Sequence, residues 1–384
     1  MAQSLCRWGV PSAGGRVKLH SIETAIIDLP VARPHKLAMA VIDRHSQVIV
    51  RIRSECGVEG LGEIAIIPHY GEEAPGAIKS MIDDCIAPYL IGHDIRRLES
   101  LVMLMDQVIK NNAYAKGGIE MACVDALARS VGVPAYQLFG GKVHVTIPLL
   151  WVLGNGVIDK DVAEAEAKLA EGRYKLFLVK IGKGDPRENV ERALAIREAL
   201  GDKARVRVDI NQGWDEPTAK WGIAELEAGG IEIIEQPLPA HDIDGMKRLT
   251  ERFSIPIMAD EGVMTAQDAM RIAHHHAADA FSVKVTKHGG LLRTKQVANI
   301  AHAAGIRLFG GTMIEGQIGT SAYAHIFSTM PNLTLGAQLF GPHLLTDDIA
   351  PATIEFKDHA LVVPDGPGFG VTLDTDKLAF YRRR

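Results

Sequence analysis

The pattern of apolar and polar positions changes about a third of the way along the chain. Residues 22–29 and 47–52 are rich in β-branched and aliphatic side chains and predict strands, and residues 57–63 contain glycines typical of a turn that leads into another strand. From residue 75 to about residue 140 the apolar positions recur at helical spacing, most clearly over 116–127. Strands followed by helices predict a small α+β domain.

Beyond residue 147 the pattern becomes repetitive. Short apolar runs alternate with helical patterns, which is typical of βα units. Eight such units would close a (β/α)₈ barrel over about 200 residues. An open doubly wound sheet is the alternative, but no GxGxxG sequence follows the first run, and we therefore favour the barrel. The runs are residues 147–152, 176–181, 206–210, 232–235, 256–260, 281–285, 307–310 and 335–338.

These patterns predict the α/β class, with a modified TIM-like (β/α) barrel and an α+β capping domain built from the N-terminal part and the C-terminal tail. Strand-like pieces at 353–356 and 360–363 suggest that the tail packs back on the first domain. The predicted parts are a loose extension over 1–17, the capping domain over 18–142, the barrel over 143–352 and the returning segment over 353–384.

Composition narrows the function classes. The 384 residues are 47% hydrophobic and 23% charged, which is ordinary for a globular protein large enough for two domains. A net charge of −5 with no basic run argues against a nucleic-acid partner. The four cysteines form no CxxC pair, which argues against a zinc cluster or disulfide framework and favours the cytoplasm. We expect neither a membrane span nor a signal peptide.

Candidate chemistry lies at the ends of the second to sixth apolar runs. Catalytic residues of such barrels lie at the C-terminal ends of the strands. Any one charged residue there is more often a solvated loop residue, but five in consecutive strands favour a site. Three converging carboxylates would repel one another without a cation, and Mg²⁺ or Mn²⁺ prefers oxygen ligands. The residues are, in chain order, Lys180, Asp209, Glu235, Asp260 and Lys284.

The three acids are therefore the predicted metal ligands, and the two lysines are predicted to lie on opposite sides of the metal. A lysine near a dication and a second ammonium should have a lowered pKa, which suits acid–base catalysis. His274, His275 and His276 fall in a helical stretch and cannot all face one ion, so we interpret them as surface residues.

Several further segments carry a family resemblance: residues 29–39, 115–125, 311–316 (GTMIEG) and 339–349. With the five charged residues, they make the chain resemble the enolase superfamily and, within it, the muconate-lactonizing (muconate cycloisomerase) subgroup. There are departures. Leu178 stands where the subgroup usually has the first lysine of Lys-x-Lys, Gln317 stands where a smaller residue is expected, and Gln338 stands where an acid is common.

The resemblance implies a divalent-metal-dependent cycloisomerase that converts cis,cis-muconate, or a close dicarboxylate, to muconolactone through a metal-stabilised enolate. Lys180 would protonate the enolate carbon, Lys284 would stabilise the anion from the other face, and Glu315 would hydrogen-bond to the substrate. The expected partner is a small carboxylate, with Mg²⁺ or Mn²⁺ as cofactor, in a homo-oligomer.

Other residues are expected to support this site. Asn211 and Glu261 would orient metal ligands and pair with a lysine. Cap loops carrying His35, Lys36 and Tyr70 would close over the barrel mouth and contact the distal end of the substrate, which would make them determinants of specificity.

Other interpretations of the sequence compete with this one. An epimerase of dipeptides or N-acylated amino acids could use the paired lysines, although the Asp-x-Asp typical of dipeptide epimerases is missing from residues 336–339. An acid-sugar dehydratase would have a histidine on the seventh strand, which the sequence lacks. A non-catalytic binding protein would be expected to lose a ligand or a lysine, and only Leu178 fits that pattern.

Overall fold

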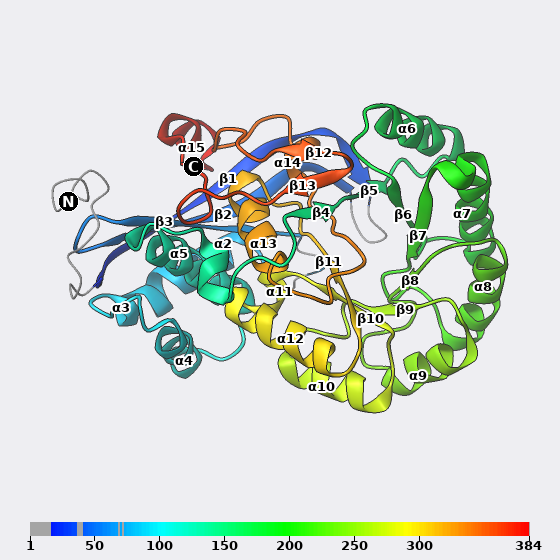
Figure 1. Cartoon of the computed structure of the whole chain (residues 1–384), viewed down its shortest axis with the longest axis horizontal. Coiled ribbons are helices and arrows are strands. Elements are labelled where there is room, and N and C mark those ends of the chain that lie inside the picture. Colours follow the sequence, from blue (N-terminus) through cyan, green and yellow to red (C-terminus); the bar gives the residue numbers. More distant parts are fainter. Residues whose placement is uncertain (1–16, 37–40, 68–69, 71–72, 384) are drawn as a thin grey trace.

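A computed structural model describes residues 17–36, 41–67, 70 and 73–383. The first part contains an antiparallel sheet in the order β1-β2-β3, which Figure 1 shows at the end of the molecule nearer the N-terminus. The strands predicted over 22–29 and 47–52 are confirmed, and they extend further in both directions. The bounds are β1 (Leu19–Lys36), β2 (Val41–Ser54) and β3 (Glu59–Ala65).

Helices pack against this sheet to complete an α+β unit. Helix α5 crosses β3 so closely that a Cβ on Gly62 would lie 2.1 Å from the carbonyl oxygen of Gly118, and glycine is therefore required there. The helical prediction for 116–127 is confirmed within α5. The helical elements are α2 (Pro75–Ser80), a π-helical turn (Met81–Ile86), α3 (Ala87–Leu90), α4 (Leu98–Val108) and α5 (Ala113–Ser130).

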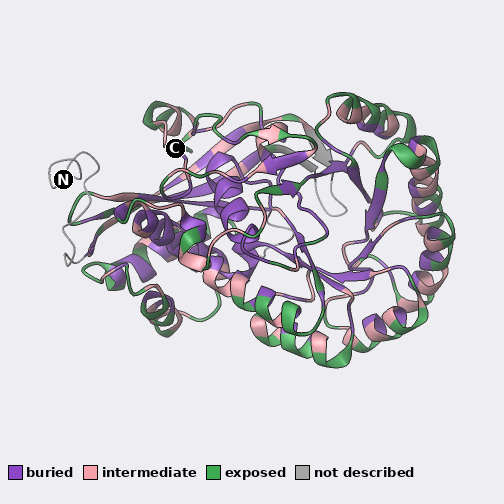
Figure 2. Cartoon of the chain, in the orientation of Figure 1, coloured by how far each residue is buried: buried purple, intermediate pink, exposed green. Residues whose placement is uncertain are grey.

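The second part is a curled parallel sheet surrounded by helices, as expected for a (β/α) barrel (Figure 1). Its strands, which are largely buried (Figure 2), are β5 (Leu150–Leu153), β6 (Leu176–Lys180), β7 (Arg205–Asp209), β8 (Ile234–Glu235), β9 (Ile257–Ala259), β10 (Ala280–Val283) and β11 (Arg307–Gly310). The helices between and after them are α6 (Ile158–Ala170), α7 (Pro186–Leu200), α8 (Glu216–Ala228), α9 (Ile243–Arg252), α10 (Ala266–His275), α11 (Val285–His288), α12 (Leu291–Ala303), α13 (Gln317–Phe327) and α14 (Gly341–Leu344).

The eighth predicted strand, over 335–338, is reduced to a bridge. Ala337 makes a parallel bridge to Leu149 beside β5 and another to Gly310 at the end of β11, so it joins the two edges of the sheet. Gly336 has a φ of +77°, which interrupts the extended backbone that a strand requires. The prediction of eight full strands was therefore wrong, whereas the barrel class is confirmed.

The C-terminal segment contacts both parts of the molecule. Strands β12 (Phe356–Lys357) and β13 (Ala360–Val362) form a sheet with β4 (Thr146–Pro148). Helix α15 (Thr375–Tyr381) follows, and Arg382 then makes an antiparallel bridge to Ile27 of β1. No helix in the described ranges is long and apolar enough to cross a membrane.

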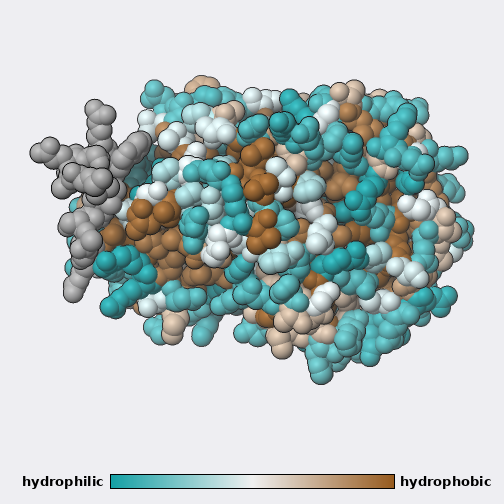
Figure 3. Space-filling view, in the orientation of Figure 1, coloured by the Kyte–Doolittle hydropathy of each residue, from teal (hydrophilic) through white to brown (hydrophobic). Residues whose placement is uncertain are grey.

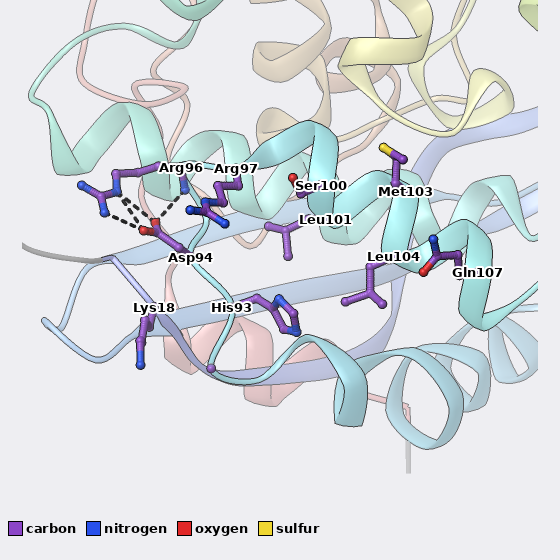
Figure 4. Close-up of a pocket in the computed structure, with 11 residues that line it drawn as sticks. Lys18, His93, Asp94, Arg96, Arg97, Ser100, Leu101, Met103, Leu104 and Gln107 are labelled. Atoms are coloured by element: carbon purple, nitrogen blue, oxygen red, sulfur yellow. Dashed lines mark hydrogen bonds and ion pairs between the residues drawn. The ribbon is translucent and has the colours of Figure 1, made fainter.

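The cap also carries a groove of about 920 Å³ between α4 and the loop that precedes it (Figure 4). Arg96 and Asp94 form an ion pair at its rim, and Leu101 and Leu104 lie along α4. None of the predicted site residues lines this groove, so its size does not identify the chemistry. Apolar side chains are also visible on the surface toward the cap end of the molecule (Figure 3). Among the exposed apolar residues of the cap, Met103 of α4 is 61% exposed.

Candidate active site

The five charged residues predicted from the strand ends lie on consecutive strands of the barrel. Lys180 ends β6 and pairs in register with Asp209 at the end of β7, which pairs with Glu235 at the end of β8. Asp260 directly follows β9, and Lys284 directly follows β10. The parallel strands therefore place the five side chains in one row, with a lysine at each end.

Each lysine binds the carboxylate nearest to it. The Nζ of Lys180 donates to Asp209 Oδ2 and, at 3.1 Å, to Asn211 Oδ1. The Nζ of Lys284 donates to Asp260 Oδ2 at 2.5 Å. Glu235 lies between these two pairs, and its buried Oε2 has no hydrogen-bond partner among the described residues.

The residue types present suit a divalent metal ion, although no three acids among the described residues are grouped so as to hold one, because lysines bind Asp209 and Asp260. Asp209, Glu235 and Asp260 offer carboxylate oxygens on adjacent strands, and all three residues are at most 2% exposed. A buried carboxylate oxygen without a partner, as in Glu235, is costly unless a cation approaches it. An all-oxygen set of this kind suits a hard cation such as Mg²⁺ or Mn²⁺.

The electrostatics reflect crowded negative charge. Burial and the charges of Asp209 and Asp260 raise the pKa of Glu235 well above its usual range. Burial alone would lower the pKa of Lys180, but the negative charges of Asp209 and Glu235 outweigh it and raise that pKa. The lowering expected from the sequence would need the positive charge of a bound dication to offset the carboxylates.

Two predicted supporting residues, Asn211 and Glu261, form a chain of hydrogen bonds with Lys180 beside the candidate metal ligands. Asn211 accepts from Lys180 and donates through Nδ2 to Glu261 Oε1 at 3.1 Å. Burial, with the charges of Asp260 and Asp209, raises the pKa of Glu261 to about 7. Asn211 has a φ of +45°, a left-handed conformation that asparagine tolerates better than most residues.

The cap contributes Tyr70 to the site. Its hydroxyl donates to Asp260 Oδ1 at 2.8 Å, and its ring lies 4.0 Å from the Nζ of Lys284. Tyr70 is therefore fixed against both a candidate ligand and a candidate catalytic lysine. His35 and Lys36 belong to β1 by their backbone, but their side chains lie outside the described residues.

Glu315 does not reach the cavity. Its carboxylate is fully buried and accepts from Thr312 Oγ1 at 2.5 Å and from the backbone N–H of Met313 at 2.9 Å. The neighbouring residues 312–314 line the cavity in its place, together with Ile67, Val152, Gln338 and Phe340. This arrangement favours a role in holding the loop over direct contact with substrate.

Sequence reasoning missed Lys287. Its fully buried Nζ donates at 2.7 Å to three acceptors, which are Asp260 Oδ1, the backbone oxygen of Asp260 and that of Ser282. All three donors of the ammonium are used, so Lys287 holds Asp260 and is not free to move a proton. Its place three residues after Lys284, which is the N-cap of α11, was the available signal.

The departures from the subgroup pattern lie at and below the site. Leu178 is fully buried within β6, two residues before Lys180, in register with Val152 and Arg207. Gln338 lines the cavity beside the bridge that closes the barrel. Both side chains are neutral where the resemblance led us to expect a charged one, and the row of lysines and carboxylates beside them is intact.

Comparison with known proteins agrees with this geometry. Residues 160–377 match the family described as "Enolase C-terminal domain-like", and residues 21–140 match "Mandelate racemase / muconate lactonizing enzyme, N-terminal domain". A barrel with this charged row and an α+β cap is the architecture of the enolase superfamily. More narrowly, the chain belongs to its mandelate racemase/muconate lactonizing enzyme family, in the muconate-lactonizing subgroup.

Individual relatives match over nearly the whole length. The chain is 40% identical to muconate cycloisomerase 1 of Acinetobacter baylyi, with 94% of this chain and 99% of that protein covered. It is 38% identical to a chloromuconate cycloisomerase of a Pseudomonas species, with 96% and 100% covered. The crystal structure of a muconate lactonizing enzyme from Pseudomonas fluorescens complexed with muconolactone superposes with a TM-score of 0.94 at 44% identity, covering 96% of this chain and all of that one.

Proposed function

We propose that the protein is a divalent-metal-dependent cycloisomerase that converts cis,cis-muconate, or a close dicarboxylate, to muconolactone. The observation that carries the proposal is the row of three carboxylates flanked by two lysines, with the unpartnered Glu235 oxygen at its centre. The names of relatives at 38–40% identity support the substrate class.

Asp209, Glu235 and Asp260 would hold Mg²⁺ or Mn²⁺, with Asp260 oriented by Lys287 and Tyr70. The bound ion would supply positive charge that stabilises the enolate form of the substrate carboxylate. Its charge would also weaken the hold of the carboxylates on the two lysines.

Lys180 is the proposed proton donor to the α-carbon of the enolate, and in the reverse direction it removes that proton. Asn211 keeps the Lys180 ammonium oriented through the 3.1 Å hydrogen bond. Lys284, at the opposite end of the row, stabilises the anion electrostatically from the other face. Apolar residues of the cavity exclude water from the reacting carbons.

The test is turnover of cis,cis-muconate by the purified protein with Mn²⁺ and, separately, with Mg²⁺. We expect loss of diene absorbance, formation of muconolactone and loss of activity with a chelator. A folded, metal-loaded protein that leaves muconate unchanged would contradict the proposal. In that case, exchange of the α-protons of dipeptides or N-acylated amino acids with deuterated solvent would identify an epimerase. Two flanking lysines also suit that reaction.

Assembly belongs to the same proposal. We expect a homo-oligomer in the cytoplasm, and the exposed apolar side chains of the cap, Tyr89 (60%) and Met103 (61%), support contact with another chain. Sedimentation of the purified protein tests this, and a monomer at micromolar concentration would contradict it.

A further inference from the structure

The loop between β11 and α13 holds a strained residue that the proposed function leaves unused. Ile314 has a φ of +68°, in the left-handed region that β-branched residues rarely adopt. Its side chain is 2% exposed and lines the active-site cavity together with Lys180 and Lys284. Strain of this kind persists only where the surroundings over-determine it, and it is concentrated at functional sites.

Hydrogen bonds fix the backbone on both sides of Ile314. The Ile314 N–H donates to Thr312 Oγ1 at 2.8 Å, and that hydroxyl donates to Glu315 Oε2 at 2.5 Å. The same carboxylate accepts from the N–H of Met313 at 2.9 Å. Glu315 therefore ties the residues before Ile314 to the residue after it, which makes the turn tight.

The far end of the loop is anchored to the cap. Glu63 of β3 accepts from the N–H of Gly316 at 2.5 Å and from the N–H of Gly319 at 2.8 Å. A Cβ on Gly341 would lie 1.8 Å from the carbonyl oxygen of Glu315, so the barrel backbone presses against the loop from the other side. The loop has no room to relax the strain at Ile314 by moving as a unit.

Ile314 lines a narrow cavity that charged and apolar residues surround. The space between the lining side chains is about 40 Å³. Lysines and carboxylates supply the polar part of its lining, and Ile67, Val152 and Phe340 join Ile314 in the apolar part. A dicarboxylate has charged ends and a hydrocarbon middle, and that middle must lie against the apolar side chains because burying it against charge is unfavourable.

We propose that Ile314 is a specificity-determining residue that limits the size of substituents on the hydrocarbon chain of the substrate. Glu315 is the positioning residue that holds Ile314 in its left-handed conformation. The inference rests on the proposed function for the substrate class, since a dicarboxylate is what the cavity would receive. A methyl group more or less in such a pocket changes discrimination by about 10-fold or more.

The test measures binding of adipate and of 3-methyladipate, two non-reacting dicarboxylates, to the Mn²⁺-loaded protein by calorimetry. In Ile314→Ala we expect the ratio of Kd for 3-methyladipate to Kd for adipate to fall about 10-fold or more. The matched control is Ile318→Ala, because Ile318 is equally buried but does not line the cavity. Its ratio should stay within about twofold of the wild-type value. An unchanged ratio in Ile314→Ala overturns the inference.

The same assay separates this inference from the proposed function. Muconate turnover together with an unchanged ratio in Ile314→Ala overturns only the role of Ile314, whereas a ratio that falls as expected without muconate turnover overturns only the proposed reaction. Glu315→Ala should lower the ratio in the same direction as Ile314→Ala. Glu315→Gln should keep it near the wild-type value, because its amide can still contact Thr312 and Met313. A wild-type ratio in a folded Glu315→Ala protein overturns the positioning role.

Discussion

At the scale of single residues, the two lysines of the site differ in their surroundings. Lys180 is held by Asp209 and by the amide oxygen of Asn211, and its side chain is 16% exposed. Lys284 is held by Asp260 and lies over the ring of Tyr70. Its side chain is only 6% exposed. This difference supports the assignment of proton transfer to Lys180 and electrostatic stabilisation to Lys284.

Replacing Lys180, the proposed proton donor, should stop the reaction without unfolding the protein. In Lys180→Ala we expect kcat to fall by about 10²–10⁴-fold or more, because proton transfer by a positioned group is lost. Metal affinity and the melting temperature should stay near the wild-type values. The control is Lys183→Ala, an exposed lysine in the following loop, which should keep full activity. Near-normal turnover by Lys180→Ala would show that another group moves the proton.

Gly311 is required by the path of Lys284. A Cβ at this position would lie 2.5 Å from Cε and 2.7 Å from Cγ of Lys284. Gly311→Ala should therefore displace the Lys284 side chain, lower kcat and cost about 1–3 kcal/mol in the free energy of unfolding. Gly76→Ala is the control, because nothing lies within 4 Å of the Cβ that it adds. Steady-state kinetics and chemical denaturation measure both effects, and wild-type kinetics in Gly311→Ala would refute the steric argument.

At the scale of elements, two cap acids bind the N-termini of barrel helices. Glu63 of β3 accepts from the N–H groups of Gly316 and Gly319 at the start of α13. Glu120 of α5 accepts from the N–H groups of Leu291 and Leu292 at the start of α12, at 2.8 and 3.0 Å. The first N–H groups of a helix have no hydrogen-bond partner within their own helix. Each acid therefore supplies acceptors to these barrel N–H groups and at the same time attaches the cap to the barrel.

This arrangement makes stability depend on pH. Burial raises the pKa of Glu120 to about 7, even though the two N–H donors oppose the shift. The folded protein therefore keeps a proton that the unfolded chain has lost between about pH 4.5 and 7, and the free energy of unfolding falls by up to about 3 kcal/mol as the pH rises through that window. The contribution is fully present below about pH 4.5.

The comparison of wild type with Glu120→Gln isolates this contribution, because glutamine stays neutral throughout. Denaturant unfolding measured at intervals from pH 4.5 to 8 should show a smaller decline in the free energy of unfolding for Glu120→Gln than for the wild type. Glu166→Gln, at an exposed position of α6, should follow the wild-type curve. Parallel curves for the wild type and Glu120→Gln would mean that Glu120 does not titrate in this window.

At the scale of the whole molecule, the proposed metal site joins three strands of the barrel and, through Tyr70, the cap. Crowded carboxylates destabilise the fold until a cation neutralises them. A ligand that binds only the folded state stabilises it by about 2.7 kcal/mol at a concentration 100 times its Kd. The melting temperature should therefore report metal binding without any assay of activity.

We expect Mn²⁺ or Mg²⁺ to raise the melting temperature and a chelator to reverse the rise. In Asp209→Asn the rise should largely vanish, since a candidate ligand loses its charge. Asp202→Asn, at a fully exposed acid in the turn before β7, should keep the rise. The ligand assignment would be wrong if Asp209→Asn retained wild-type metal affinity.

The sequence alone determined the fold class and the charged row. Strand periodicity placed Lys180, Asp209, Glu235, Asp260 and Lys284 at strand ends, and parallel strands bring their carboxyl ends to one edge whatever the details of packing. Only the tertiary structure decided the rest. Ala337 closes the barrel as a bridge because Gly336 turns the backbone, Lys287 fixes Asp260 from the next helical turn, and Glu315 turns away from the cavity to strain Ile314. These features depend on contacts between segments far apart in the chain, and such contacts cannot be predicted from the local pattern of apolar and polar residues.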